Sequence, residues 1–259
     1  MSTPLPLTGV VIAKNEAGRI GRCVASMARV CAEVWVLDSG STDATVDEAE
    51  AAGARARQQD WLGFSAQKNA AIALATQPWV LLLDADEWLG DGTEVALRGL
   101  FAERAIERAD VWELERRTHF LGVELNHGGW GREGVERLFR NDLRYLPAEV
   151  HEKLDLRGRR VAHLRARIEH DTARSLDDYR SKLARYATLW AQQKHAEGRR
   201  AGAFAASLHA TSYWLKNYVV RGGFLDGAMA RVYHACHARY VFDKYKALRA
   251  LSHARRTRP

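Results

Sequence analysis

The sequence predicts an α/β protein in which a mixed sheet is flanked by helices and is followed by a helical C-terminal extension. Three observations predict this fold class. Over roughly the first 90 residues, short runs of continuous apolar residues alternate with helical segments, which is typical of parallel strands covered on both faces. Residues 111–120 then alternate in character, as expected for a strand of a mixed sheet. From residue 176 onward, apolar residues recur at helical spacing.

The individual elements follow from the same patterns. In the first part of the chain we expect strands at residues 7–13, 33–37 and 79–83, and helices at 20–30, 45–52 and 64–75. The glycine-rich residues 122–134 are expected to form a loop, and shorter strands are expected at 136–139, 153–156 and 161–168. Two apolar stripes indicate helices in the extension, formed by Leu176, Tyr179, Leu183, Tyr186 and Trp190 and by Phe204, Leu208, Thr211, Leu215 and Tyr218.

Composition indicates an ordinary folded protein. The chain has 259 residues, of which 47% are hydrophobic and 27% are charged, so it can bury a full core and is not expected to be disordered. Its cysteines, Cys23, Cys31 and Cys236, have neither metal-site spacing nor a disulfide pattern, and a reducing compartment is expected. The N-terminus lacks the pattern of a secretory signal, and no apolar run reaches the ~20 residues of a membrane span. A cytoplasmic location is therefore expected.

Charge is distributed unevenly along the chain. Residues 194–259 contain 13 basic and 3 acidic side chains, a balance of +10, whereas the whole chain carries +7 and the first 193 residues therefore carry −3. This asymmetry suggests that the tail faces an anionic partner such as lipid headgroups, a phosphorylated glycan or nucleic acid. A nucleic-acid-binding protein is the non-enzymatic alternative, motivated by a pI of about 9.5. The net positive charge is confined to the tail and no nucleic-acid-binding motif is present, so no nucleic-acid partner is expected.

Polar residues follow the expected parallel strands. Asn15, Asp38 and Asp84 each come just after a strand, and ligands of such sheets bind beyond the carboxyl ends of the strands. Asp84 and Asp86 are separated by one residue and could present hard oxygen ligands to Mg²⁺ or Mn²⁺. Such a cation would stabilise a diphosphate leaving group. The alternative interpretation of Asp84-Ala85-Asp86 is a solvated acidic turn.

The ordered set of motifs narrows the function. Val10-Val-Ile-Ala-Lys-Asn15-Glu16, Val36-Leu-Asp38-Ser-Gly-Ser41-Thr-Asp43, Gln67-Lys68-Asn69 and Asp84-Ala-Asp86 together resemble glycosyltransferase family 2, inverting nucleotide-diphospho-sugar transferases with the GT-A fold. The resemblance covers about the first 90 residues. It implies a catalytic domain in residues 1–175, with a nucleotide-sugar half in 1–93 and an acceptor half in 94–175. Residues 176–259 would form the basic helical extension.

The resemblance also implies roles for individual residues. Asp38 would accept a hydrogen bond from the uracil imide of a UDP-sugar, and Lys68 would lie near the base or the diphosphate. Asp84 would contact the ribose or the metal, and Asp86 would be the main protein ligand of the metal. The remaining nucleotide-sugar contacts are expected from Ala13, Asn15, Glu16 and Ala85. For Lys68 the alternative is a solvated helix residue.

Further short motifs indicate one group of enzymes within this family. Trp61-Leu-Gly-Phe64-x-x-Gln67-Lys-Asn69, Asp84-Ala-Asp-Glu-Trp88, Val150-His151-Glu152, His170 and Gly222-Gly-Phe-Leu-Asp-Gly227 are similar to bacterial lipopolysaccharide core β-glucosyltransferases that act on heptose. This implies UDP-glucose as donor and a heptosyl lipopolysaccharide core as acceptor. The alternative within the class is a family 2 enzyme with another glycan, lipid or protein acceptor.

Inverting transfer requires a base that deprotonates the acceptor hydroxyl. Glu152 is the candidate, because it follows a strand-like segment in the half where the family places its acceptor side. The alternative is a surface carboxylate paired with Lys153 or Arg137, and Asp155 is the reserve candidate. His170 is expected to contribute to the metal or diphosphate site, as family members often place a histidine there.

The acceptor side is expected to include Trp130, Arg132 and His151. An indole face suits a sugar ring, and Arg suits phosphate. His151 competes with His170 for the ligand role. Aromatic residues among basic ones in the tail favour an amphipathic element lying on an anionic membrane surface. The resemblance, through its heptosyl lipid acceptor, implies that this surface is the inner face of the bacterial inner membrane. Ordinary helix packing with a solvated basic face is the alternative.

Overall fold

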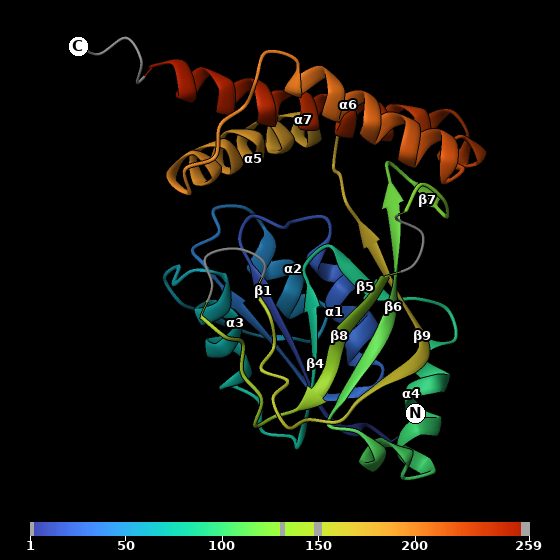
Figure 1. Ribbon diagram of the computed structural model, residues 1–259. Helices are drawn as coiled ribbons and strands as arrows, with labels where there is room; N and C mark the ends of the chain where they lie inside the picture. The colour runs from blue at the N-terminus through green and yellow to red at the C-terminus, as the bar shows by residue number, and fades with distance from the viewer. Residues whose placement is uncertain (1–2, 130–132, 148–151, 255–259) are drawn as a thin grey trace. The chain divides into compact units, whose positions relative to one another are not determined.

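The computed structural model describes residues 3–129, 133–147 and 152–254 of the chain. The chain divides into two compact units, which we describe separately. The first unit comprises residues 1–116 and 133–170, and the second comprises residues 117–132 and 171–259. In Figure 1 the first unit contains the sheet, and the second contains the long helices coloured orange and red.

The first unit is built on a mixed sheet, which confirms the predicted fold class. Four parallel strands come first in the chain: β1 (Leu5–Ala13), β2 (Cys31–Asp38), β3 (Arg55–Gln58) and β4 (Trp79–Asp84). The later strands are β5 (Glu87–Leu89), β6 (Val111–Phe120), β8 (Glu133–Arg140) and β9 (Val161–Asp171). The spatial order is β3-β2-β1-β4-β8-β6-β9-β5, and β8 runs antiparallel to β4 (Figure 1).

Two separate apolar clusters explain why the central strands are apolar at every position. On β4, Leu81 and Leu83 belong to one cluster, whereas Val80 and Leu82 belong to another, because successive side chains point to opposite faces. The first cluster is closed by α1 (Ile20–Ala28) and α4 (Thr93–Ala102), and the second by α3 (Phe64–Ile72). The helix α2 (Thr45–Ala51) and the short 3-10 helix η1 (Ala105–Arg108) complete the unit.

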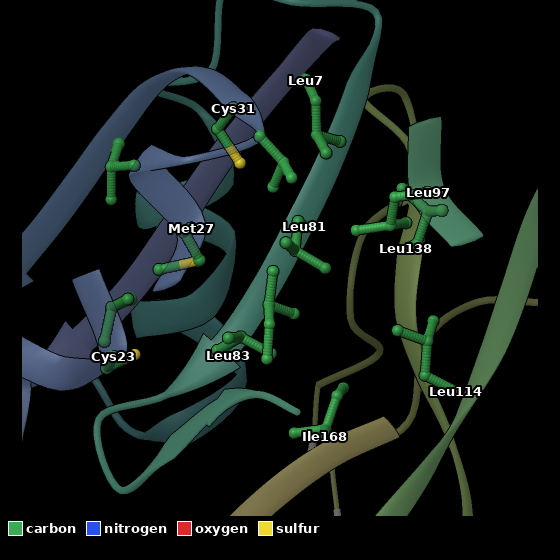
Figure 2. Packing of buried hydrophobic residues seen from close by; sticks show 14 of the residues in the cluster. Leu7, Cys23, Met27, Cys31, Leu81, Leu83, Leu97, Leu114, Leu138 and Ile168 are labelled. Atoms are coloured by element: carbon green, nitrogen blue, oxygen red, sulfur yellow. The ribbon is translucent and has the colours of Figure 1, made fainter. Parts of the chain in front are cut away.

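Figure 2 shows the first of these clusters, in which β4 lies between α1 and the later strands. Cys23 and Cys31 are buried there as free thiols, as expected for core residues. Gly9 of β1 permits the close approach of α1. A Cβ atom at this position would lie 3.0 Å from the sulfur of Met27 and 3.2 Å from a methyl group of Val34. The central strand therefore needs glycine where the helix crosses it.

The second unit is mainly helical, as predicted for the chain beyond residue 176. It contains α5 (Leu176–Ala196), α6 (Ala205–Trp214), the π-helix η2 (Leu215–Val220), the 3-10 helix η3 (Gly223–Asp226) and α7 (Gly227–Ala254). Ser175 caps α5 by accepting a hydrogen bond from the backbone of Asp178. The short strand β7 (Val123–Leu125) pairs with the end of β6, and Phe120 and Leu125 pack in one core with Tyr179 and Tyr233.

Several local predictions need correction. Residues 153–156 contribute only an isolated bridge between Tyr145 and Leu154, and the region expected as a loop contains β7 and the start of β8. The second stripe is helical as predicted, but it faces outward: Phe204 is 83% and Leu208 68% exposed. Within the part of the chain that the structure describes, no helix combines the length and apolar character that crossing a membrane would require.

Candidate active site

The ends of the central parallel strands meet at one edge of the sheet. The pairing register aligns Ala13, the last residue of β1, with Asp38 of β2, and aligns Ile12 with Asp84 of β4. Asp38 and Asp84 therefore flank the end of β1, as expected from their positions after buried strands. The polar residues that follow these strands form the candidate active site of the first unit.

The carboxylate of Asp38 organises the turn after β2. One of its oxygens accepts hydrogen bonds from the backbone of Gly40 at 2.9 Å and of Ser41 at 2.8 Å, and the other accepts from the Ser41 hydroxyl. The residue is 3% exposed. An ionised carboxylate can accept about four hydrogen bonds, so one more donor can still be accommodated. The turn thus holds Asp38 in one orientation while leaving capacity for a ligand.

The loop after β1 is tied to this turn. The side-chain oxygen of Asn15 accepts from the Thr42 backbone at 2.8 Å, and the Asn15 backbone donates to the Ser41 hydroxyl at 2.8 Å. Asn15 has φ of 56°, a left-handed conformation that asparagine tolerates better than most residues. The backbone of Glu16 donates to the Thr45 hydroxyl at 2.7 Å. The side chain of Asn15 therefore locks two loops together.

Lys68 lies in the interior and is not a solvated helix residue. It is 5% exposed, and its Nζ lies 2.6 Å from Oε1 of Glu152 and 3.4 Å from Oδ1 of Asp84. Burial would lower the pKa of Lys68, but the Asp84 carboxylate and the hydrogen bond to Glu152 outweigh this and raise it. Lys68 therefore bridges Asp84, at the end of β4, to Glu152, which lies 84 positions after Lys68 in the chain.

The two neighbours of Lys68 explain how α3 presents it. Gln67 is fully buried and donates to the Ser39 hydroxyl at 3.1 Å, which attaches α3 to the turn after β2. Asn69 forms two hydrogen bonds with the backbone of Tyr145, of 2.9 and 2.8 Å. The triplet 67–69 thus connects the helix to both sides of the site while its middle residue bridges Asp84 and Glu152.

A buried network of charges surrounds Asp84. Arg137 of β8 donates to the Asp84 carboxylate and, at 2.6 Å, to Oε1 of Glu87. Glu87 is fully buried, and Arg116 of β6 lies 3.7 Å from it. Burial would raise the pKa of Asp84, but Arg137 and Lys68 outweigh it and hold that pKa well below its ordinary value. Asp84 is therefore ionised, and its charge is compensated by the protein itself.

Asp86 lies outside this network and next to His170. Its Oδ2 is 3.4 Å from Nε2 of His170 and 3.8 Å from a guanidinium nitrogen of Arg19. The antiparallel pairing of β5 with β9 sets Glu87 opposite His170, which brings the histidine to the Asp84-Ala85-Asp86 turn. The side chains of Asp86 and His170 are each 19% exposed, so both reach solvent.

These two side chains fit a cation that binds together with its substrate. Among the described residues, no group of three or more His, Cys, Asp or Glu side chains is arranged to hold a metal ion. Mg²⁺, however, is usually bound by one or two carboxylates, with the remaining positions filled by water and substrate phosphates. A carboxylate also suits Mn²⁺, and a neutral imidazole is a common metal ligand. The donor set formed by Asp86 and His170 is therefore compatible with a metal that a diphosphate would help to bind.

Glu152 faces the site, whereas Asp155 does not. Glu152 pairs with Lys68, and not with Lys153 or Arg137. Burial would raise its pKa, but the hydrogen bond and charge of Lys68 lower it. Asp155 binds Arg157 at the surface, which holds the pKa of Asp155 at about 2. Of the expected acceptor residues, Trp130, Arg132 and His151 lie outside the described residues.

Sequence analysis did not assign Arg137, Arg116 or Glu87 to the site. Arg137 was considered only as a surface partner of Glu152, although it precedes Leu138 and Phe139 in a strand whose neighbours are buried. An arginine within such a strand requires a charged partner, which is the signal that could have identified it. Arg116 and Glu87 lacked such a signal, because their pairing depends on the distant return of β6 and β8 to the sheet.

The geometry can be compared with known proteins. Residues 8–100 match the model of glycosyl transferase family 2. The chain is 29% identical over 266 residues to the lipopolysaccharide core biosynthesis glycosyltransferase LpsC of Rhizobium meliloti (strain 1021), with 96% of each chain covered. It is also 37% identical over 109 residues to an uncharacterized glycosyltransferase of Rickettsia felis, a match that covers 42% of this chain and 38% of the relative.

Among solved structures, residues 1–349 of S. aureus TarS in complex with UDP-GlcNAc are 13% identical, with a TM-score of 0.49 and coverage of 96% and 92% of the two chains. The family match spans β1 to α4 and includes Asn15, Asp38, Lys68, Asp84 and Asp86. The protein is a glycosyltransferase, and its residues 8–100 are similar to glycosyl transferase family 2.

Proposed function

We propose that the protein is an inverting, metal-assisted glycosyltransferase that moves glucose from UDP-glucose to a heptose of the lipopolysaccharide inner core. The observation that carries the acceptor assignment is the match to LpsC along 96% of both chains, since its name places that relative in lipopolysaccharide core biosynthesis. The observation that supports the chemistry is the bridge that Lys68 makes between Asp84 and Glu152.

The donor would bind beyond the ends of β1, β2 and β4. Asp38 would accept the imide N–H of uracil with its remaining acceptor capacity, and Ala13, Asn15, Glu16 and Ala85 would line the nucleoside and ribose. The hydrogen bonds that fix Asp38 and Asn15 support this role, because a site that is already ordered loses little entropy on binding.

The diphosphate would lie near Asp86, His170 and Lys68. A divalent cation held by Asp86 and His170 would neutralise charge that develops on the departing diphosphate. Asp86 suits this role better than Asp84, because Arg137 and Lys68 already compensate the charge of Asp84. Asp84 would instead hold Lys68 in place and contact the ribose.

Glu152 would act as the general base. The acceptor hydroxyl would lose its proton to a carboxylate oxygen of Glu152 while its own oxygen forms a bond to the anomeric carbon. The bond from that carbon to the diphosphate would break on the opposite face, so that UDP leaves with the electron pair and the configuration inverts. Lys68 weakens Glu152 as a base while the two are paired. A diphosphate that attracts Lys68 would therefore strengthen the base when the donor is bound.

The acceptor would contact the half of the catalytic domain formed by residues 94–175. Trp130, Arg132 and His151 stay predicted acceptor contacts. A heptosyl lipid acceptor would be anchored in the cytoplasmic leaflet of the inner membrane. The +10 balance of residues 194–259 supports a peripheral location on such an anionic surface. A glycan, lipid or protein acceptor of another kind is the alternative.

The test is a transfer assay with separated donor and acceptor choices. UDP-, GDP- and dTDP-sugars are supplied with Mg²⁺, Mn²⁺ or EDTA, and the acceptor is lipopolysaccharide truncated at the heptose or carrying a complete core. We expect glucose transfer from UDP-glucose only to the truncated acceptor and only with a cation. Full activity in EDTA would exclude the metal, and donor hydrolysis without transfer to the truncated acceptor would favour another acceptor.

A further inference from the structure

The second unit presents an outward apolar surface formed by α6, η2 and η3. The structure describes every residue of α6, and none of them is buried. Large apolar side chains extend along the segment with exposed fractions from 48% to 83%; they are Phe204, Leu208, Leu215, Val219, Val220, Phe224 and Leu225. Monomeric proteins rarely expose contiguous apolar patches of this kind unless the patch binds something. We call these seven residues the outward apolar surface.

The backbone keeps four of these side chains on one face. Phe204, Leu208, Leu215 and Val219 follow one another at spacings that return to the same face of a helix. The last part of this stretch is the π-helix Leu215–Val220, in which Asn217 is the buried residue. Single π-turns are rare and are frequently found at functional sites. Here the turn keeps Leu215, Val219 and Val220 exposed while Asn217 faces the interior.

The tip of the surface is held rigidly. In the motif Gly222-Gly-Phe-Leu-Asp-Gly227, Asp226 accepts hydrogen bonds from the backbone of Asn126 at 2.9 Å and of His127 at 2.8 Å. Gly223 packs so closely that a Cβ atom there would lie 2.5 Å from Nε2 of His234. Between these two anchors, Phe224 is 51% and Leu225 61% exposed. Phe224 makes an edge-to-face contact with Tyr218, with 6.4 Å between ring centroids, but the motif still leaves about half of Phe224 and more than half of Leu225 in water.

The charges within residues 198–225 have one sign, although the acidic Glu197 and Asp226 directly flank this segment. Residues 198–225 contain no Asp or Glu, and their basic side chains, all exposed, are Arg199, Arg200, Lys216 and Arg221. An apolar face bordered by Lys and Arg is the pattern of elements that lie in the headgroup region of anionic bilayers. A shallow hollow of about 480 Å³ beside Leu215, lined also by Trp214 and Phe242, adds apolar surface to this side.

We propose that the outward apolar surface inserts into the headgroup region of an anionic lipid bilayer, with Phe224 and Leu225 at its tip. The membrane-bound acceptor of the proposed function would give this docking a use, but lipid binding itself does not depend on the transfer reaction. Insertion differs from attraction of the basic tail alone. Electrostatic attraction is screened over about 8 Å at physiological salt, whereas the insertion of apolar side chains persists.

The test measures partition of the full chain onto vesicles by flotation. The vesicles contain phosphatidylglycerol with phosphatidylethanolamine, or phosphatidylcholine alone, and the salt concentration is varied. The variants are Phe204→Gln with Leu208→Gln, Phe224→Gln with Leu225→Gln, and Arg199→Gln with Lys216→Gln. Val95→Gln is the matched control, because Val95 is 74% exposed on α4 of the first unit.

We expect each apolar pair to lower the partition coefficient on the anionic vesicles by about tenfold or more, at low and high salt alike. The basic pair should lower binding only at low salt, and Val95→Gln should leave binding unchanged. Unchanged binding of both apolar pairs would overturn the proposal. So would a change of molecular mass from dimer to monomer in these variants without a change in lipid binding, because the surface would then join two copies of the chain.

A second measurement uses the unaltered protein, so that it does not depend on the folding of the variants. Backbone hydrogen exchange across residues 204–225 should slow in the presence of anionic vesicles, whereas exchange in α4 should not change. Equal slowing in both segments, or in neither, would contradict insertion. UDP-glucose hydrolysis separates the two proposals: a protein that binds vesicles but uses no UDP-sugar would refute the proposed function and leave the docking surface intact.

Discussion

The two units differ in how they bury most of their polar groups, although the second unit also buries the charged Arg117, which pairs with Glu124. In the first unit, Lys68, Glu87 and Arg137 are almost completely buried with charges that are matched by carboxylates or cations. In the second unit, Tyr179 donates to or accepts from His237 at 2.6 Å within an aromatic cluster. Burial, with His234 as a further cause, lowers the pKa of His237 to about 3, so this histidine is neutral.

The charge network of the first unit suits chemistry, whereas the aromatic cluster of the second unit suits packing. Buried ion pairs are often no more stable than apolar residues of similar size, because desolvation of both ions offsets their attraction. A neutral histidine and tyrosine satisfy their polar atoms at a lower desolvation cost. The charges of the first unit are therefore better explained by a need for fixed positive and negative groups near a substrate than by a need for stability.

The largest expected effect comes from Asp86, which lies beside His170 and Arg19 and is the proposed ligand of the metal. Asp86→Ala should abolish transfer, with a loss of about 10³-fold or more in kcat/KM, because charge stabilisation by a bound cation contributes several kcal/mol. The unfolding free energy should change little, since Asp86 is partly exposed. Transfer assays measure the first half of this prediction, and urea unfolding measures the second. Wild-type turnover in the variant would remove Asp86 from the mechanism.

Unlike Asp86→Ala, a substitution of Arg137 should strongly lower the free energy of unfolding. Arg137→Met leaves Glu87 and Asp84 without their main cation, and we expect a loss of about 3–5 kcal/mol in the free energy of unfolding. Arg140→Met is the matched control on the same strand, because Arg140 pairs with the largely exposed Glu107 and should contribute only about 1 kcal/mol. Urea unfolding compares them. Equal losses in both variants would mean that the buried charge network contributes no more stability than the surface ion pair of Arg140.

Glu152→Gln keeps the shape of the side chain and removes its capacity to take a proton. We expect kcat to fall by about 10²-fold or more while donor binding stays nearly intact. Single-turnover kinetics at saturating donor measure the effect. Asp155→Asn is the control, because Asp155 is engaged by Arg157 at the surface. A similar loss in the Asp155 variant, or none in the Glu152 variant, would move the base elsewhere.

The smallest expected effect concerns His237, the neutral histidine of the aromatic cluster in the second unit. Unfolded His237 takes up a proton near its ordinary pKa of about 6.5, whereas the folded protein does so only near 3. Its contribution to stability is therefore complete above pH 6.5 and is lost as the pH falls from there towards 3, by up to about 1.4 kcal/mol per pH unit. His237→Phe should reduce the slope of unfolding free energy against pH by that amount between pH 6.5 and 5.

His163→Gln is the control for this slope, because His163 is exposed on β9 in the first unit. The comparison uses slopes and not absolute stabilities, since His237→Phe also removes the hydrogen bond to Tyr179. Identical slopes for the wild type and His237→Phe would show that the histidine is not held neutral by the fold.

The parallel core was predictable because its cause is local. Strands such as β4 are buried on both faces, so their residues are apolar without interruption, and the polar residue that ends each strand is easy to recognise. Asp38 and Asp84 were found in this way. The sequence shows that Arg137 is charged but does not show that it pairs with Asp84, because that pairing requires β8 to return antiparallel beside β4.

The outward apolar surface shows a different limit of sequence analysis. Periodicity correctly indicated that Phe204, Leu208 and Leu215 share one face of a helix. It contains no information on whether another element covers that face, and the structure leaves these side chains exposed. Similarly, the pattern around Lys68 allowed either a solvated or a buried residue, and only the distant Glu152 decides between them.

The path of the chain also limits how this enzyme can be divided or recombined. The second unit is formed by two separate stretches of the chain. Phe120, at the end of β6, belongs to the second unit, and the chain then returns to the first unit at β8 before α5 begins. A fragment that starts at residue 171 would lack Phe120 and Leu125, and one that ends at residue 170 would leave them without Tyr179 and Tyr233. No single cleavage can therefore release an intact helical module, and its transfer to another scaffold would require both stretches to be joined by a new linker.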